Sequence, residues 1–512
     1  MVQAIRDLYS KHKKILLIAF VSGVLIHGYM MFNKYPNYDE YISMFHYGGG
    51  YHLGRWFLAL LGNFLFRIDG CYSLPWFNGL LTVAFLAVAI VLFLAPFEIE
   101  KLYHNVLLVV MFLAFPTVTA TFSFMFTAPF YAFAVLLAAL AFYLTVKYRF
   151  GFIVSALLLG LSMGIYQAYF NLLAAFLLIY LLTMCIAEKY KVSQIVAAGF
   201  RYLGALAGGM AVYFVANIVL TMLQGVSLSS YQGISNMGQY SLSSIMNAIA
   251  VCYKTFFSFF YQDYKSLLPY PIMNGLIILG MVITVTCVVW IIIKNGKRNW
   301  LKSLFFVAGM AVMPVAVNLI CVMCAESMET IHTLMCYGVV LMYFIPLIFQ
   351  EKIRQFFGQK RWMSVTGVVY RVGIIAVMAL YIRFANISYF SYQLYFQQTY
   401  SVMQTLSARI QMTPGYELQT PVGFGGVYTD KAAPMWEMRY VDNLAGTYKP
   451  AYIINSGAMR ANIFKYFLGT AYTETMLGEE ILESEEYLAM PVYPDDGSIQ
   501  RMGDVIVVKF SE

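Results

Sequence analysis

The chain has 512 residues, of which 61% are hydrophobic and only 11% charged, with a formal net charge of +8. Soluble domains hold about 25% charged residues, so this composition excludes an ordinary water-soluble fold. About 20 apolar residues cross the hydrocarbon core of a bilayer, and the sequence repeats such runs many times. It therefore predicts a polytopic, all-α membrane protein.

Eleven apolar runs are candidates for membrane-spanning helices. They cover residues 15–33, 74–95, 105–116, 125–146, 152–166, 170–187, 196–223, 272–293, 303–324, 333–350 and 364–384. The first run follows a basic start, and no small-residue cleavage site comes after it. We expect a retained helix there and not a signal peptide.

Positive charge orients these spans. With a cytoplasmic N-terminus, the inner segments hold eighteen Lys and Arg residues and the outer loops hold five, as the positive-inside rule requires. Counting Gly54–Phe66 as another span would turn most of the basic residues outward. That run is also too short to cross the bilayer upright. We therefore expect Tyr51–Phe66 to form a helix at the outer surface.

The composition changes after the last span. Residues 385–512 carry 14 acidic and 8 basic residues, and the odd number of spans places them outside. Turn residues in YPDDGSI (Tyr493–Ile499) precede the β-like run DVIVVKF (Asp504–Phe510), and ANIFKYFLGT is typical of a helix. We predict a transmembrane domain over 1–384 and a small α/β extracytoplasmic domain over 385–512.

Two adjacent carboxylates, Asp39 and Glu40, lie in the first outer loop, within NKYPNYDEYI. Partial desolvation at an interface raises the pKa of a carboxylate and makes it a better general base. Such a base can take the proton from a sugar hydroxyl that attacks an activated anomeric carbon. A solvated loop, or a first helical turn in which acids are favoured, explains the same residues without any chemistry.

Other outer-loop residues are candidates for binding. The guanidinium of Arg55 can pair with a lipid phosphate through two hydrogen bonds, although a snorkelling arginine that fixes helix depth is an equal alternative. Glu326, Glu329 and His332 can bind a divalent cation or orient an acceptor, because Glu329 and His332 have i, i+3 spacing. A short polar connector explains those three equally well.

The distribution of charge separates two classes of function. A flippase or transporter typically places ionisable residues near the bilayer midplane, often beside broken helices. Here the spans are almost free of such residues, and the ionisable groups gather in the outer loops. This favours an enzyme that acts on a lipid-borne substrate at the outer leaflet. A lipid-linked sugar flippase or polysaccharide transporter is the alternative.

Four stretches of the chain resemble the membrane glucosyltransferase II family of bacterial and phage cell-surface enzymes. They follow one another in the expected order over nearly the whole sequence. They are NYDEY followed by GGGYHLGRWFLALLG, LSMGIYQAYFNLLAAF (Leu161–Phe176), HTLMCYGVVLMYFIP (His332–Pro346) and MPVYPDDGSIQRMGDVIVVKF (Met490–Phe510).

The resemblance implies a GT-C type bundle with surface helices in the first outer loop, in a bacterial plasma membrane. It implies inverting transfer of a hexose, with glucose as the first expectation, from a polyprenyl-phosphate sugar. The acceptor would be a cell-envelope glycan such as O-antigen, teichoic acid or another wall polysaccharide, and no nucleic acid is involved. The family commonly has two aspartates where this chain has Asp39 and Glu40, so the choice of base between them stays open.

The hypothesis that follows assigns the remaining candidates. The donor phosphate is held near Arg55, with Lys34, His52 or His332 as further contacts. Tyr166, Gln167, Glu326 and Glu329 are the candidates for binding sugar or acceptor. The sequence identifies no cofactor, and a divalent cation on Glu326, Glu329 and His332 stays open.

Overall fold

The structure is a computed structural model of the chain. It describes residues 2–42, 50–65, 73–230, 241–261, 271–294, 300–323, 332–358, 361–430, 441–470 and 472–512. These residues form two compact units. Unit 1 comprises Met1–Lys34, Phe45–Ile387 and Asn443–Ala445, and unit 2 comprises Tyr35–Met44, Ser388–Asp442 and Gly446–Glu512.

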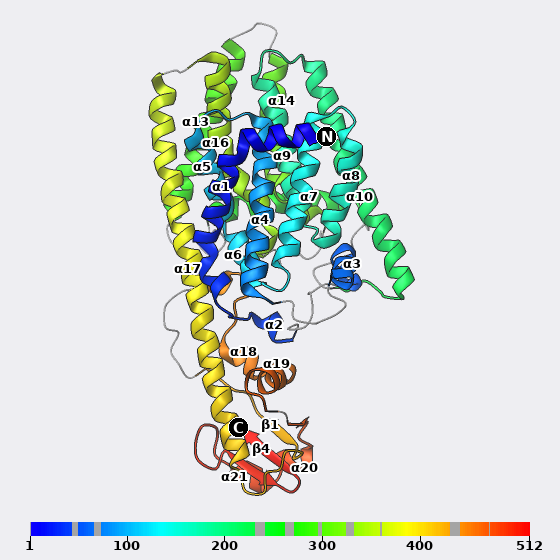
Figure 1. Ribbon diagram of the computed structural model, residues 1–512, viewed down its shortest axis with the longest axis vertical. Helices are drawn as coiled ribbons and strands as arrows, with labels where there is room; N and C mark the ends of the chain where they lie inside the picture. Colours follow the sequence, from blue (N-terminus) through cyan, green and yellow to red (C-terminus); the bar gives the residue numbers. More distant parts are fainter. Residues whose placement is uncertain are drawn as a thin grey trace. The chain divides into compact units, whose positions relative to one another are not determined.

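Unit 1 is a helical bundle, and each of the eleven expected ranges contains a helix (Figure 1). Several long helices run side by side through it. The helices are α1 (Val2–Phe32), α3 (Trp56–Leu65), α4 (Pro75–Leu94), α5 (Leu102–Ala114), α6 (Pro116–Ser123), α7 (Ala128–Lys147), α8 (Gly151–Ile165), α9 (Tyr169–Ile186), α10 (Val192–Gln224), α11 (Leu242–Tyr261), α13 (Pro271–Lys294), α14 (Trp300–Ala316), α15 (Ile320–Met323), α16 (Leu341–Phe357) and the first half of α17 (Arg361–Gln411). Short turns η1 (Tyr51–Leu53), η2 (Ala95–Phe97), η5 (Thr333–Met335) and η6 (Tyr337–Val340) connect some of them.

Several of these helices are long and apolar enough to cross a membrane, as the composition predicts. Among the described residues eight pass by length and composition, or nine if the bent pair α5 and α6 forms one span. The helices α8 and α14 are apolar but shorter. The chain is therefore a membrane protein, while the count of eleven spans stays a prediction.

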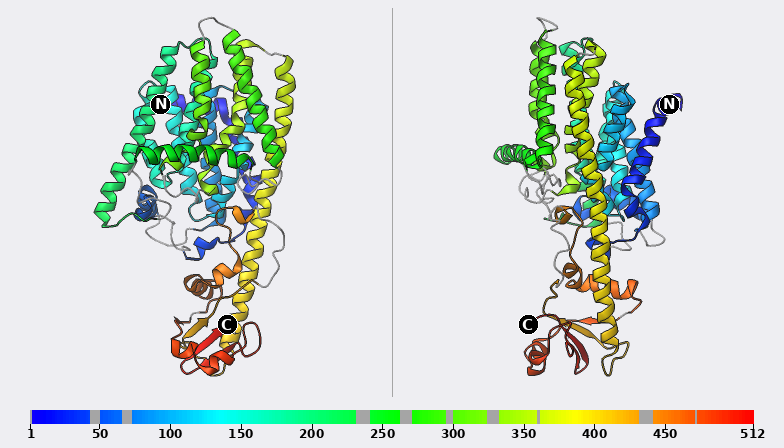
Figure 2. Two further views of the ribbon diagram at one scale, coloured as in Figure 1. Left: turned by 180° about the vertical axis from the view of Figure 1, so that it is seen from behind. Right: turned by 90° about the vertical axis from the view of Figure 1, so that its left-hand side faces the viewer.

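The helix α11 was not expected, because residues 224–271 are predicted to form an outer loop. It is apolar along one face, and Leu242, Met246 and Phe257 are exposed. Figure 2 shows this green helix lying across the direction of the long helices. A helix with one apolar face in that orientation is typical of the membrane interface. The stretch expected to connect two spans thus contains a helix, and this helix is also one of the eight that pass by length and composition.

Aromatic rings fill the centre of unit 1, around α9, the most enclosed of the candidate spans. Phe93 of α4 stacks on Phe176 of α9 with ring centroids 3.9 Å apart, and Phe142 of α7 packs against both. Small residues let α8 and α10 approach closely: a Cβ on Gly160 would lie 2.4 Å from Val212 Cγ1. Close backbone contact of this kind stabilises helix pairs in lipid.

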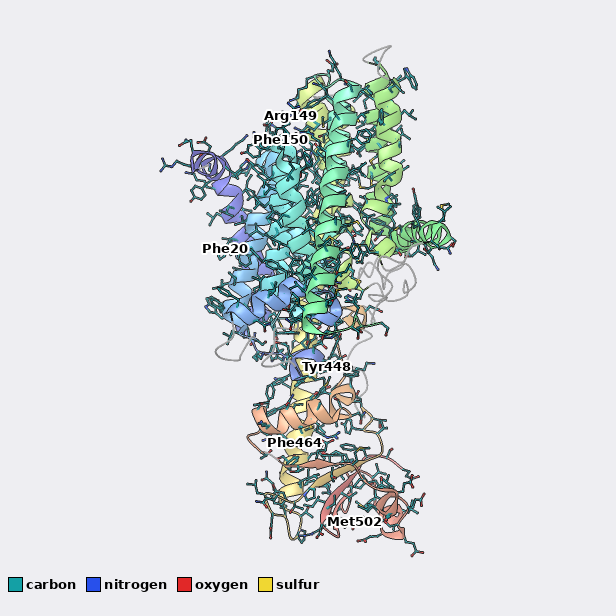
Figure 3. The ribbon with its side chains drawn as sticks, turned by 90° about the vertical axis from the view of Figure 1, so that its right-hand side faces the viewer. Phe20, Arg149, Phe150, Tyr448, Phe464 and Met502 are labelled. Carbon is teal, nitrogen blue, oxygen red and sulfur yellow. The ribbon has the colours of Figure 1, made fainter. Side chains whose placement is uncertain are left out.

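Unit 2 contains a four-stranded sheet in the order β2-β1-β4-β3. The strands are β1 (Val422–Gly425), β2 (Glu474–Thr475), β3 (Ile499–Met502) and β4 (Val505–Lys509). β1 pairs in parallel with β2 and β4, whereas β3 and β4 form an antiparallel hairpin. The run at Asp504–Phe510 is therefore a strand, as predicted. Its Val507 packs with Tyr487, Met490 and Met502, the last labelled in Figure 3.

Short helices complete unit 2. They are α2 (Tyr38–Ile42), the second half of α17, α18 (Pro450–Ile454), α19 (Gly457–Asn462) continued by η8 (Ile463–Phe467), α20 (Glu479–Leu482) and α21 (Glu485–Ala489), while η7 (Val441–Asn443) joins the units. Lys509, only 2% exposed, donates to the carbonyls of Tyr487, Leu488 and Met490. These bonds hold α21 to the sheet.

Candidate active site

A glycine turn places Arg55 at the start of α3. Gly54 has φ +66°, a left-handed conformation that only glycine adopts without strain. A Cβ there would also lie 2.5 Å from the Tyr213 hydroxyl and 2.9 Å from Gln167 Nε2. The single helix expected over Tyr51–Phe66 is therefore two pieces, η1 and α3, with the turn between them.

The side chain of Gln167 holds the Gly54 turn in place through hydrogen bonds. Its Nε2 donates to the Leu53 carbonyl and to the Tyr213 hydroxyl, both at 3.0 Å. The side chain is 7% exposed. The amide nitrogen of Gln167 thus supports the turn that carries Arg55, and the predicted contact with sugar stays a prediction.

Arg55 lies against an aromatic wall. Its guanidinium carbon is 5.4 Å from the centre of the Tyr166 ring, close enough for a cation–π interaction. Tyr166 in turn stacks on Tyr131 with centroids 4.7 Å apart and meets Tyr169 edge-on at 5.5 Å. These rings come from α7, the α8–α9 turn and α9, so the bundle itself fixes the wall on which the cation rests.

His332 completes this group. Burial and the neighbouring charge of Arg55 lower the pKa of His332 to about 4. The imidazole is therefore neutral at neutral pH, and among the described residues its buried Nδ1 has no hydrogen-bond partner. A neutral imidazole carries one N–H donor and one acceptor. It can hydrogen-bond to a phosphate or a sugar hydroxyl but adds no second positive charge.

Two further candidates for contact with the donor phosphate lie elsewhere in unit 1. The Lys34 ammonium donates to the Ser73 carbonyl at 3.2 Å, which ties the end of α1 to the start of α4. His52 is exposed on η1, and its carbonyl accepts from the Ser229 N–H at 2.9 Å. Their predicted contacts with donor phosphate stay predictions.

The two carboxylates lie in unit 2, on α2, and their environments differ. The Asn37 N–H donates to Glu40 Oε2 and the Glu40 N–H donates to Asn37 Oδ1, both at 3.0 Å. This reciprocal pair is a capping box, which satisfies two amide donors at a helix start. Glu40 is 1% exposed, whereas Asp39 is only partly buried. Glu40 therefore supports the helix that presents Asp39.

Tail residues hold α2 in place. The hydroxyls of Tyr41 and Tyr448 are 3.1 Å apart, and Asn462 Nδ2 donates to the Tyr41 carbonyl at 2.6 Å. Burial raises the pKa of both tyrosines above their ordinary value, so they stay protonated. The segment Tyr35–Met44 at the start of the first outer loop thus belongs to unit 2, whereas the rest of that loop belongs to unit 1. The expected domain boundary at 384/385 does not anticipate this division.

The proposed metal ligands are only partly described. Glu326 and Glu329 lie outside the described residues. Within the described ranges, no three His, Cys, Asp or Glu side chains gather as a metal ion would require. The divalent cation therefore remains an open prediction.

Comparison with known proteins decides the family. The model of the family described as "Glucosyl transferase GtrII" matches residues 28–343, more than half of the chain. The chain belongs to the GtrII glucosyl transferase family. The matched residues include all of the candidate site residues in both units. The stretch Met490–Phe510, which also resembles the family, lies outside the matched residues. No curated protein and no solved structure matches the chain.

This GtrII protein also uses residues that sequence reasoning missed. Gly54, Tyr131, Tyr169 and Tyr213 build the support around Arg55, and only Gly54 carries a local signal, as a glycine directly before a charged helix start. The capping box had a readable signal too, because Asn followed three residues later by Glu is a helix N-terminus pattern.

We predict that a methyl group on Gly164 disturbs the GtrII site through α3. A Cβ there would lie 2.6 Å from Trp56 Cε2 and 2.9 Å from Phe57 Cβ, so Gly164→Ala must push α3 away from α8. Overpacking of this kind costs about 1–3 kcal/mol. We expect a lower thermal midpoint and weaker donor use. Gly275→Ala is the control, because nothing lies within 4 Å of its Cβ; an equal loss in both variants would contradict the prediction.

The depressed pKa of His332 predicts a pH dependence of stability. Between its ordinary pKa of 6.5 and about 4, the unfolded chain binds a proton that the folded protein does not. This contribution to stability is therefore complete above pH 6.5 and is lost as the pH falls toward 4. Thermal midpoints in detergent should fall less steeply over this range for His332→Gln than for the unmodified protein. Parallel slopes would contradict the prediction.

Proposed function

We propose that this GtrII family member transfers a hexose, glucose in the first instance, from a polyprenyl-phosphate donor to a cell-envelope glycan. The observation that carries the proposal is Arg55, held by the Gly54 turn against the Tyr166 ring and beside the neutral His332. A guanidinium that is held in place by an aromatic ring can form two hydrogen bonds with a phosphate. The long apolar helices of the same protein suit a phosphate that is attached to a lipid.

The reaction is a single displacement. Asp39 takes the proton of an acceptor hydroxyl, and the resulting oxygen attacks the anomeric carbon. The bond between that carbon and the phosphate oxygen breaks, and the electron pair leaves with the polyprenyl phosphate, so the configuration inverts. Arg55 and the neutral His332 stabilise the charge on the leaving phosphate. Glu40 holds α2 in shape and takes no proton.

The site is assigned to the outer face of a bacterial plasma membrane. The positive-inside distribution of Lys and Arg supports a cytoplasmic N-terminus, eleven spans and an extracytoplasmic tail. On this topology the loops that carry Asp39, Arg55 and His332 all face outward. The acceptor is then a glycan of the envelope, such as O-antigen, teichoic acid or another wall polysaccharide.

Transfer of radiolabel tests the proposal. Full-length protein in detergent is mixed with polyprenyl-phosphate [¹⁴C]glucose and crude envelope glycan from the source cells. We expect label to move into the glycan with inverted anomeric configuration. If no label moves to the glycan, but the same protein in vesicles carries the labelled lipid across the bilayer, the protein is a flippase and the proposed transferase activity is wrong.

A further inference from the structure

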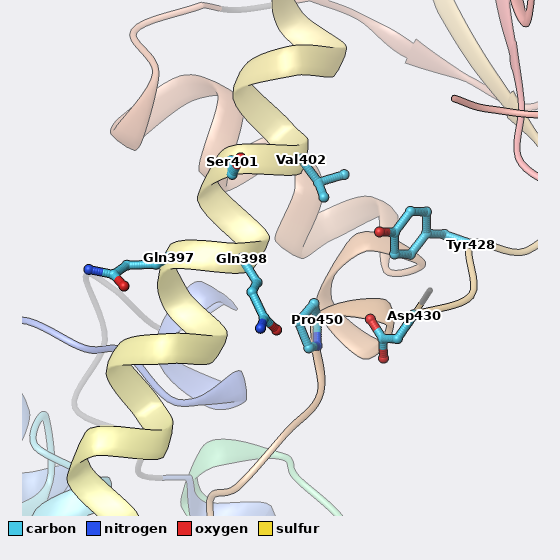
Figure 4. A pocket seen from close by; sticks show the side chains of 7 residues that line it. All are labelled: Gln397, Gln398, Ser401, Val402, Tyr428, Asp430 and Pro450. Atoms are coloured by element: carbon cyan, nitrogen blue, oxygen red, sulfur yellow. The ribbon is translucent and has the colours of Figure 1, made fainter. Parts of the chain in front are cut away.

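Unit 2 contains a pocket that is separate from α2 and lies outside residues 28–343. Its volume is about 350 Å³, and it lies between the second half of α17, the segment after β1 and the start of α18 (Figure 4). It is lined by Gln397, Gln398, Ser401, Val402, Tyr428, Asp430 and Pro450. A volume near the lower end of the range for small-molecule sites, about 300–1,000 Å³, admits one or two sugar rings.

The wall formed by Tyr428 and Asp430 is built rigidly. A single side chain, Asn455, binds both backbone groups of Tyr428: the Tyr428 N–H donates to Asn455 Oδ1 at 2.8 Å, and Asn455 Nδ2 donates to the Tyr428 carbonyl at 2.9 Å. Asp430 Oδ1 accepts from the Ala451 N–H at 2.9 Å, in the first turn of α18. A carboxylate accepts through two oxygens, so the second remains able to bind a ligand.

The opposite wall offers polar groups that are not used by the protein. In the described part of the chain, the amides of Gln397 and Gln398 have no hydrogen-bond partner. Figure 4 shows Gln398 and Val402 directed toward Pro450 and Tyr428, whereas the Gln397 side chain extends away from them on the other side of the helix. Each amide carries two N–H donors and one carbonyl acceptor, which match the paired hydroxyls of a sugar.

The chemistry of the lining selects the ligand class. The ring of Tyr428, with Val402 and Pro450, gives an apolar surface for the C–H face of a pyranose. Among the described residues that line the pocket there is no Lys or Arg, and the one charged side chain among them is the Asp430 carboxylate. Partial burial raises the pKa of Asp430, against the effects of the Ala451 N–H and of Lys449. An anionic ligand is disfavoured here, and so is the donor phosphate.

We propose that this pocket binds a neutral sugar unit of a glycan chain. The Gln398 amide on one wall recognises sugar hydroxyls, and the Asp430 carboxylate and the Tyr428 ring on the other wall recognise further hydroxyls and the face of the sugar ring. The further assignment of this glycan as the acceptor rests on the proposed function. The binding of a neutral glycan to the pocket does not depend on it.

Binding without donor tests the pocket directly. The probe is the neutral polysaccharide of the source-cell envelope, cut to short oligosaccharides, labelled with a fluorophore and titrated with the full-length protein in detergent. We expect Gln398→Ala and Tyr428→Ala to weaken binding about tenfold or more, a difference of about 1.4 kcal/mol. Gln404→Ala is the matched control, an exposed glutamine on the same helix outside the pocket. It should bind within twofold of the unmodified protein.

Each outcome decides the assignment. Equal affinity of all three variants, no binding by the unmodified protein, or preference for phosphate-bearing oligosaccharides would overturn it. Because removing the Tyr428 ring can disturb its neighbour Phe510, Gln398→Ala carries the test if Tyr428→Ala fails to fold. Pocket-dependent binding without any sugar transfer would leave the pocket standing and refute the transferase. Transfer with an unchanged acceptor KM in Gln398→Ala would leave the transferase standing and refute the assignment of the bound chain as the acceptor.

Discussion

Replacing Asp39 by Asn is expected to reduce hexose transfer by about 10²–10⁴-fold, the usual contribution of a positioned general base. Asparagine keeps the size of the side chain and its place in the first turn of α2, but it cannot take a proton from the acceptor hydroxyl. The loss should therefore appear in kcat, with donor binding unchanged. The measurement is the initial rate of radiolabel transfer at saturating donor, together with donor affinity from a separate titration.

The neighbouring carboxylate supplies the matched control. Glutamine can serve at the third position of a capping box, so Glu40→Gln keeps the bond from the Asn37 N–H and should keep most of the activity. Glu40→Ala removes the cap and should lower stability by about 0.5–2 kcal/mol. If Glu40→Gln loses transfer as Asp39→Asn does, the separation of a base from a structural acid is wrong. If Asp39→Asn transfers hexose at the normal rate, Asp39 is not the general base.

Much of the fold could be predicted because its signals are local. Apolar runs the length of a bilayer predicted the long helices, and an unbroken run of β-branched residues predicted the strand Val505–Lys509. The helix α11 was missed because Lys254 and several Ser residues lower the hydrophobicity of the run. Those polar residues share the helix with a separate apolar face, which a count of apolar residues along the chain does not detect.

The site was harder to predict because its contacts join distant parts of the chain. Tyr41 meets Tyr448 across 407 positions, and the rings beside Arg55 come from two separate stretches, one at Tyr131 and one at Tyr166 and Tyr169. Arg55 and Tyr166 were both candidates because both are predicted to lie in outer loops, and the structure places them in contact. Gln167 was a candidate for the same reason, but the hydrogen bonds of that amide to Leu53 and Tyr213 depend on packing that no spacing in the sequence reveals.

Replacing Arg55 is expected to weaken donor use more than any other single change in unit 1. Truncating one partner of a hydrogen-bonded charge pair costs about 2–5 kcal/mol, so Arg55→Ala should lower kcat/KM for the polyprenyl-phosphate sugar by roughly 30-fold to several thousand-fold. Arg55→Lys should restore little, because an ammonium cannot form the two parallel bonds that a guanidinium makes with phosphate. Steady-state rates over a range of donor concentrations measure the effect.

Arg149 is the control that separates phosphate binding from a general role of arginine in this membrane protein. It lies in the turn between α7 and α8, with its guanidinium carbon 5.5 Å from the ring of Phe150, nearly the geometry of Arg55 on Tyr166 (Figure 3). Arg149 is exposed and distant from the Gly54 turn, so Arg149→Ala should leave kcat/KM within about twofold, as substitutions at exposed surface positions usually do. If Arg149→Ala and Arg55→Ala lower it equally, Arg55 fixes helix depth like any snorkelling arginine. If only Arg55→Ala does so, and Arg55→Lys fails to rescue, a bidentate contact with the donor phosphate is the remaining explanation.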